Sequence, residues 1–363
     1  MIKWFHPSFW GKEKKYVQDA LDSGWISDGE YIRKFEKVFA DYLGISNAMT
    51  VSNGTTALYL ALLALKIGPG DEVIVPGYTF AAPANMVLAT GAKPVFVDID
   101  PDTWLLSSEK LESQITKNTK AIIPVHIYGN VCAMDSIKEV AKEYNLAIIE
   151  DVAEAAFSKY SNQYAGTFGD FGCFSFQATK TISMGEGGAV ITNNAELADM
   201  AKVIRNHGMR PEKRYWHEVV GHNFRLTNYQ AALGYGQLEK VEDIIANKKR
   251  VYNSYKERLD NVAGITLQQI KNQVDPVMWA VVVKIDKNFF KGDRDFVRQI
   301  LLDKGIETRG GFYSFSAMPL YRAKKLPVSE LISENIISLP SYASLDSDKI
   351  NYICDQFLSL KKE

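Results

Sequence analysis

The chain has little of several features that would assign it to a common class of protein. Its 363 residues include only three cysteines, Cys132, Cys173 and Cys354, and this odd number at wide spacing excludes a disulfide framework and a CxxC metal pattern. We therefore expect three buried, reduced thiols. The five histidines show no HxxxH or HxH spacing, so we predict no metal site.

Neither sign of charge is in excess. The chain has 42 Lys and Arg against 43 Asp and Glu, so no global field favours nucleic acid or an anionic membrane, and a small molecule is the expected partner. No apolar run reaches the ~18 residues of a membrane span, and the opening residues MIKWFHPSFWGKEKK lack the apolar segment of a signal peptide. We expect a cytoplasmic protein that binds neither nucleic acid nor membrane.

What the sequence does contain is an alternation of apolar runs and helical patterns between residues 48 and 151. Short β-branched runs without polar alternation, separated by amphipathic helices, are typical of parallel strands that helices bury on both faces. The sequence therefore predicts an α/β fold with a large, mostly parallel sheet. The runs are AMTVS, DEVIVP, KPVFVDI, KAIIPVHIYG and LAIIEDV.

The pattern changes after about residue 225. The stretch LTNYQAALGYGQLEKVEDIIANKKRVYNSYKERLD has apolar positions three and four apart and predicts one long helix that links two domains. The remainder, with WAVVVKI, DRDFVRQILLDKG and a last helix, suffices for a small α+β domain. We predict a large domain over residues 1–245, including an N-terminal arm, and a small C-terminal domain over 246–363.

Ligands of open α/β sheets bind beyond the carboxyl ends of the strands, where Asp151 and Lys180 are expected. Alone, Asp151 would more often cap a helix, and Lys180 would more often be a solvated cation. Together they match the needs of pyridoxal phosphate (PLP). A lysine holds that cofactor's aldehyde as a Schiff base, and a carboxylate keeps its ring nitrogen protonated.

The stretch SNGTTALYL could bind the phosphate of such a cofactor. A strand end, a glycine and two hydroxyl residues precede a helix, and the N–H groups of a helix N-terminus bind anions. An ordinary N-cap by Asn53 or Thr55 is an equally good interpretation. Ser175 adds a hydroxyl near Lys180, and Phe80, after a strand end, could cover one face of a ring or belong to the core.

In this order, these stretches resemble the DegT/DnrJ/EryC1/StrS family of sugar aminotransferases, and the resemblance spans nearly the whole chain. It implies the fold-type I, aspartate aminotransferase-like architecture, PLP as cofactor, a homodimer with shared active sites, and amination of a keto sugar attached to a nucleotide. The matching stretches are SNGTTALYLAL, VIVPGYTFAAPANMVLATGAKPVFVDIDPDTW, IIEDVAEA, GDFGCFSFQATKTISMGEGGAVITNN and GHNFRLTNYQAALGYGQLE.

The resemblance also implies a role for individual residues. It makes Lys180 the Schiff-base lysine and proton shuttle, Asp151 the partner of the ring nitrogen, and Glu154 a polar neighbour of the ring hydroxyl. Asn223 is implied to reach the phosphate in the neighbouring subunit. The other implied contacts are stacking by Phe80, the phosphate at Gly54, Thr55, Thr56 and Ser175, and substrate at His217, Arg225 and Tyr313.

Three further stretches, DSGWISDGEYIRKFEKVFADYLG, RNHGMRPEKRYWHEVVGHNFRLTN and KGIETRGGFYSFSAMPLY, resemble one branch of this family. That branch aminates GDP-4-keto-6-deoxymannose to GDP-perosamine with glutamate as donor. The chain departs from it at Gly310 and Gly311, where the branch has proline and an aromatic residue, so we expect a reshaped loop near Tyr313.

Other functions remain open from the sequence. The substrate could be another nucleotide-linked keto sugar, with UDP or dTDP. A regulatory protein could keep the fold without the chemistry, but the chain retains both Lys180 and Asp151. A nicotinamide enzyme is disfavoured because no GxGxxG follows the first strand.

Overall fold

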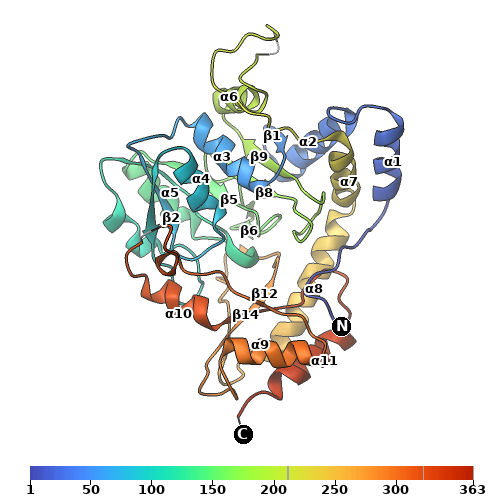
Figure 1. The fold of residues 1–363 in the computed structure, drawn as a ribbon, viewed down its shortest axis with the longest axis vertical. Helices are drawn as coiled ribbons and strands as arrows, with labels where there is room; N and C mark the ends of the chain where they lie inside the picture. Colours follow the sequence, from blue (N-terminus) through green and yellow to red (C-terminus); the bar gives the residue numbers. More distant parts are fainter. Residues whose placement is uncertain (211, 322, 363) are drawn as a thin grey trace.

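The computed structural model describes residues 1–210, 212–321 and 323–362 (Figure 1). A seven-stranded sheet forms the larger part, in the order β1-β9-β8-β5-β4-β2-β3. The neighbouring pairs from β8 to β3 are parallel, and β9 is antiparallel to both its neighbours, which confirms a mostly parallel sheet. The strands are β1 Asn47–Val51, β2 Glu72–Pro76, β3 Lys93–Val97, β4 Thr119–Ile122, β5 Ala147–Asp151, β8 Phe171–Ser175 and β9 Gly188–Thr192.

Both faces of this sheet are buried. In β2, Val73 and Val75 join one hydrophobic cluster and Ile74 joins the other, since successive side chains of a strand point to opposite faces. Helices on both faces explain why the strands read as unbroken apolar runs. One cluster takes residues from α3 Gly54–Ala64, α4 Ala82–Ala89 and α6 Ala195–Arg205; the other takes them from α1 Glu13–Asp22, α2 Glu30–Leu43, α5 Met134–Glu143, α7 Asn228–Leu238 and α10 Pro327–Asn335.

A four-stranded antiparallel sheet, in the order β10-β12-β14-β13, lies below the larger part in Figure 1. A third hydrophobic cluster joins it to three helices. The elements are β10 Ile265–Leu267, β12 Val281–Ile285, β13 Arg309–Gly310, β14 Ile336–Leu339, α8 Val241–Leu259, α9 Arg294–Asp303 and α11 Ser347–Leu358. A further small sheet holds β6 Lys159–Tyr160, β7 Gln163–Tyr164 and β11 Val274–Asp275, and four 3-10 turns cover Ser108–Lys110, Glu112–Gln114, Ile127–Gly129 and Phe315–Ala317.

The prediction of one long helix after residue 225 is wrong. The chain forms α7 and α8 with a break at Glu239 and Lys240, whose ψ of 18° departs from helical geometry. The two helices pack against different parts of the molecule, because α7 contacts α1 and α2 whereas α8 contacts α11 and β10. A methyl group on Gly236 of α7 would lie 2.9 Å from the Cα atom of Glu13, so α1 can approach α7 closely only at a glycine.

The N-terminal arm connects the two parts of the molecule. Ile2 forms a parallel bridge with Ile306, and the Trp4 indole N–H donates to Ser338 Oγ (2.9 Å) in β14. The arm then passes α8 to reach α1 (Figure 1). Since α8 runs through residue 245 and the arm also contacts the four-stranded sheet, the predicted domain limits 1–245 and 246–363 stay a prediction.

All three cysteines are buried and free, as expected. Across residues 1–210, 212–321 and 323–362, we find no helix that combines the length and the apolar character needed to cross a membrane.

Candidate active site

Lys180 lies in the loop between β8 and β9, at the carboxyl edge of the large sheet. Backbone hydrogen bonds from Phe176 N–H to Gly187 O and from Ala178 N–H to Gly185 O, both 2.8 Å, close this loop. Gly185 has φ +79°, a left-handed conformation that glycine adopts at little cost. The glycine-rich turn after the lysine thus shapes the loop that carries it.

Two buried carboxyl groups lie near Lys180. Asp151 ends β5 and accepts the Ala153 N–H at Oδ1 (3.0 Å). Burial raises the pKa of the Asp151 carboxyl, and the Ala153 amide and Lys180 act against this rise. Glu154 Oε1 is 3.7 Å from Lys180 Nζ, and its Oε2 accepts the Tyr128 N–H (2.9 Å). Burial raises the pKa of Glu154 too, and Lys180 opposes this rise. The single Lys180 amine therefore favours the charged form of both buried carboxyl groups.

The predicted phosphate site is the N-terminus of α3, packed against the end of β8. Asn53 caps the helix by accepting the Thr56 N–H at Oδ1 (2.8 Å), and the Thr56 hydroxyl donates to the same oxygen (2.8 Å). A methyl group on Gly54 would lie 2.7 Å from Ser175 Cβ, so the helix can meet the strand only because residue 54 is glycine. Gly54, Thr55, Thr56 and Ser175 therefore lie together. The capping interpretation of Asn53 is correct, and phosphate binding at this site stays a prediction.

Phe80 lies at one margin of this edge, and its ring is 56% exposed. Its edge contacts Phe312, with ring centroids 5.9 Å apart. Tyr313 is 65% exposed in the loop after β13. A side chain at Gly311 would collide with the Tyr78 hydroxyl at 2.3 Å, whereas Gly310 has ordinary space. The departure at Gly311 thus fits the packing of Tyr78.

Two aromatic residues that sequence reasoning missed contact the Lys180 site. The Trp279 ring centroid is 3.9 Å from Lys180 Nζ, and its indole N–H donates to Thr179 O (2.7 Å). Tyr128 binds Glu154 through its backbone and has φ +62°, in the left-handed region that non-glycine residues seldom adopt. No spacing rule marks a tryptophan 99 residues after the lysine; only the position of Trp279 as the first residue of the WAVVVKI run places it at a strand end.

The remaining predicted residues lie in a separate loop that rises from α6 at the top of Figure 1. Its ends pair through bridges Asn206 to Asn223 and Met209 to His217. Asn223 Oδ1 accepts from Arg225 Nε (3.2 Å), and His217 Nδ1–H donates to His207 O (2.8 Å). Asn223, Arg225 and His217 are exposed there, and the contacts above join them to their own loop and not to Lys180.

Comparison with known proteins agrees with this arrangement. The sequence profile described as the DegT/DnrJ/EryC1/StrS aminotransferase family matches residues 8–358. A GDP-perosamine synthase of Escherichia coli O157:H7 is 45% identical over 97% of this chain and 96% of that protein, and one of Caulobacter vibrioides is 43% identical over 97% of each. The solved structure of a putative sugar aminotransferase from Streptococcus pneumoniae in its PLP form superposes with a TM-score of 0.91 at 27% identity, covering 98% of this chain and 97% of that chain.

The fold and these comparisons define a PLP-dependent aminotransferase of the aspartate aminotransferase-like architecture. More narrowly, the chain belongs to the DegT/DnrJ/EryC1/StrS aminotransferase family. The residues fit the cofactor. One edge of the sheet carries a lysine amine, two buried carboxyl groups and the N-terminus of α3, which meets β8 at Gly54.

Proposed function

We propose that the chain converts GDP-4-keto-6-deoxymannose to GDP-perosamine with glutamate as amino donor. The Lys180 amine, next to Glu154 and near the buried Asp151, is the observation that carries the aminotransferase chemistry. The names of the two relatives, both GDP-perosamine synthases that align over nearly their full length, support the choice of sugar.

When bound, PLP supplies the electron sink that lets an amino group pass from one carbon to another. Lys180 is the residue proposed to hold its aldehyde covalently. With its amine free, Lys180 would accept at Nζ the proton that leaves the amine-bearing carbon of glutamate, and it would return a proton to C4 of the sugar.

Asp151 and Glu154 are proposed to hold protons at two further atoms. The Asp151 carboxylate would keep the ring nitrogen protonated, which offsets the cost of burying that carboxylate. Glu154 would hold the ring hydroxyl and keep Lys180 Nζ within reach. Phe80 would cover a ring face, and Gly54, Thr55, Thr56 and Ser175 would receive the phosphate at the α3 N-terminus.

We further propose a homodimer with shared sites. The loop with Asn223 exposes large apolar side chains: Tyr215 is 72% exposed, Trp216 52% and Val220 84%. Monomers seldom expose such a cluster, and a twofold axis would place the loop of one chain at the site of the other. Asn223 would then reach the partner's cofactor phosphate, and His217, Arg225 and Tyr313 would contact the nucleotide sugar.

A substrate panel tests the proposal. Purified protein loaded with PLP is given glutamate and the GDP-, UDP- and dTDP-linked 4-keto-6-deoxy sugars, and the product sugar and 2-oxoglutarate are measured by mass spectrometry. We expect at least tenfold faster turnover of GDP-4-keto-6-deoxymannose, with the two products formed in equal amounts. Faster turnover of a UDP or dTDP sugar would reassign the substrate and leave the aminotransferase assignment intact.

A further inference from the structure

One side chain to which the family resemblance assigns no role contacts both the amine of Lys180 and the backbone next to it. The ring of Trp279 lies under the amine, with 3.9 Å from Nζ to the ring centroid. The indole N–H of the same residue donates to the carbonyl of Thr179, the residue before Lys180, at 2.7 Å. Trp279 thus touches the lysine at its amine and anchors the backbone that carries it.

Trp279 is itself held by groups from three other segments of the chain. Its N–H donates to Tyr128 O (2.9 Å), which ties it to the same residue that binds Glu154. Its carbonyl accepts from Lys248 Nζ of α8 at 2.7 Å, and Lys248 also donates to Ser341 O at 2.7 Å. The edge of Trp4 packs on the ring, with centroids 5.7 Å apart.

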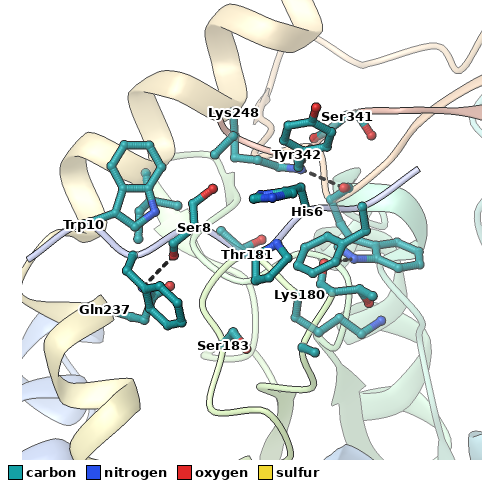
Figure 2. A pocket seen from close by; sticks show the side chains of 18 of the residues that line it. His6, Ser8, Trp10, Lys180, Thr181, Ser183, Gln237, Lys248, Ser341 and Tyr342 are labelled. Carbon is teal, nitrogen blue, oxygen red and sulfur yellow. Dashed lines mark hydrogen bonds between the residues drawn. The ribbon is translucent and has the colours of Figure 1, made fainter. Parts of the chain in front are cut away.

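Burial of Lys248, which supports Trp279, costs free energy because it removes the ammonium group from water. Lys248 is 6% exposed, and burial lowers the pKa of its ammonium to about 7. It lines the same pocket of about 190 Å³ as Lys180, together with His6, Ser8 and Trp10 of the N-terminal arm (Figure 2). A desolvated lysine bound to two backbone carbonyls fixes the position of both segments, one of which ends at Trp279.

We propose that Trp279 is the positioning residue of Lys180, and that Lys248 holds Trp279 in place. This inference rests on the proposed role of Lys180 as the residue that binds the cofactor covalently. The ring attracts the ammonium form, and the indole hydrogen bond keeps the loop from drifting. The attraction between an aromatic ring and a partly buried cation shifts the equilibrium between contact and separation roughly threefold to thirtyfold.

Two substitutions at residue 279 separate these contributions. Trp279→Phe keeps a ring under the amine and removes the hydrogen bond to Thr179, whereas Trp279→Leu removes both. Trp104→Phe is the matched control, because the buried Trp104 also donates its indole N–H to a backbone carbonyl, that of Pro101 (3.1 Å), outside this site. Lys248→Met tests the support from α8.

The first measurement is made without cofactor. An amine-specific reagent is applied at one fixed pH, and mass spectrometry of peptides compares the labelling rate of Lys180 with that of exposed lysines. We expect the Lys180 rate to change roughly tenfold in Trp279→Leu, about threefold in Trp279→Phe and in Lys248→Met, and less than 1.5-fold in Trp104→Phe. The thermal midpoint of each variant is recorded in parallel.

The second measurement uses the loaded enzyme. Trp279→Leu should lower kcat roughly tenfold and alter the visible circular dichroism band of the bound cofactor, while KM for the nucleotide sugar stays within twofold. Trp279→Phe should recover part of both. If Trp279→Phe and Trp104→Phe behave alike, or if Trp279→Leu labels and turns over like the wild type, the inference is wrong.

The two hypotheses fail in different ways. If the wild-type protein is not fixed to PLP at Lys180 by borohydride, the proposed function fails before any variant is made. If the wild type passes that test and Trp279 variants keep the wild-type labelling rate, only the positioning role is lost. Should Trp279→Leu not fold, the pair of Trp→Phe variants still decides.

Discussion

We expect Lys180 and, in the loop of residues 206–210 and 212–225, His217, Asn223 and Arg225 to belong to the active site, yet the two regions are built differently. Lys180, Asp151 and Glu154 lie in a packed interior where each contacts named groups of its own chain. In the loop, Asn223 and Arg225 are exposed and bond to each other, and the large rings of Tyr215 and Trp216 face solvent. The contacts within the first region thus come from one chain, and the second region has the exposed surface that we propose a partner covers.

The largest expected effect is at the centre of the first region. Lys180→Ala should abolish turnover, because it removes the amine that lies 3.7 Å from Glu154 and that we propose to bind the cofactor. Lys249→Ala is the control, since Lys249 of α8 forms an exposed ion pair with Asp275 of β11. Borohydride treatment of loaded protein followed by peptide mapping checks the assignment, and a label on another lysine would contradict it.

A smaller but still large effect is expected from the charge of Asp151. Asp151→Asn keeps the size of the side chain and removes the carboxylate that we propose to hold a proton on the ring nitrogen. Turnover should fall at least about 100-fold, which corresponds to roughly 3 kcal/mol in the barrier. Steady-state kinetics at saturating substrates measures it. A fall of less than threefold would leave Asp151 with only its contact to the Ala153 amide.

The features of the site that the sequence could predict are those that depend on local signals. The Lys180 loop, the Asp151 strand end and the α3 N-terminus depend on local signals, namely an apolar run followed by glycine, a hydroxyl or an acid. Their positions at the sheet edge follow from the topology. Trp279 and Tyr128 could not be predicted in this way, because their contacts with Lys180 and Glu154 depend on how distant segments meet.

Other elements show the same limit. The periodicity of residues 226–260 continues through Glu239 and Lys240, and only the separate packing of α7 and α8 explains the break. No local sequence signal explains why Gly311 departs from the branch pattern. In the structure, the Tyr78 hydroxyl occupies the space that a side chain at residue 311 would need. The roles of Asn223, His217 and Arg225 rest on family resemblance and stay predictions.

The next prediction tests whether the two regions meet across a dimer. Asn223→Asp should inactivate by placing an anion beside the cofactor phosphate. If inactive Lys180→Ala and Asn223→Asp chains exchange subunits, one site of each mixed dimer carries both changes and the other carries neither. Random pairing makes about half of the dimers mixed, so roughly a quarter of wild-type activity should return. Mass spectrometry of intact dimers verifies exchange, and no recovery despite exchange would assign Asn223 to its own subunit.

The smallest expected effect is on stability without cofactor, and its size differs between the two regions. Burial raises the pKa of Asp151 in the folded protein, so the folded chain keeps a proton that the unfolded chain has released. Stability then falls as pH rises through this interval, and the full cost is present above the raised pKa. Asp151→Asn removes that cost and should raise the Tm of the cofactor-free protein by a few degrees near pH 8.

This gain should shrink as the pH falls through the raised pKa of Asp151 toward the ordinary value near 4, below which the wild-type carboxyl is neutral in both states. Asn223→Asp is the matched change in the exposed loop, where water solvates either side chain, so Tm should move by less than about 1 °C. Calorimetry of the cofactor-free proteins between pH 5 and 8 measures both. Adding PLP should make the wild type more stable than Asp151→Asn, because only the wild-type carboxylate has the charge that we propose the ring nitrogen requires. A cofactor-free Asp151→Asn protein that is less stable than the wild type at pH 8 would mean that the carboxylate already has its counter-charge within the folded chain.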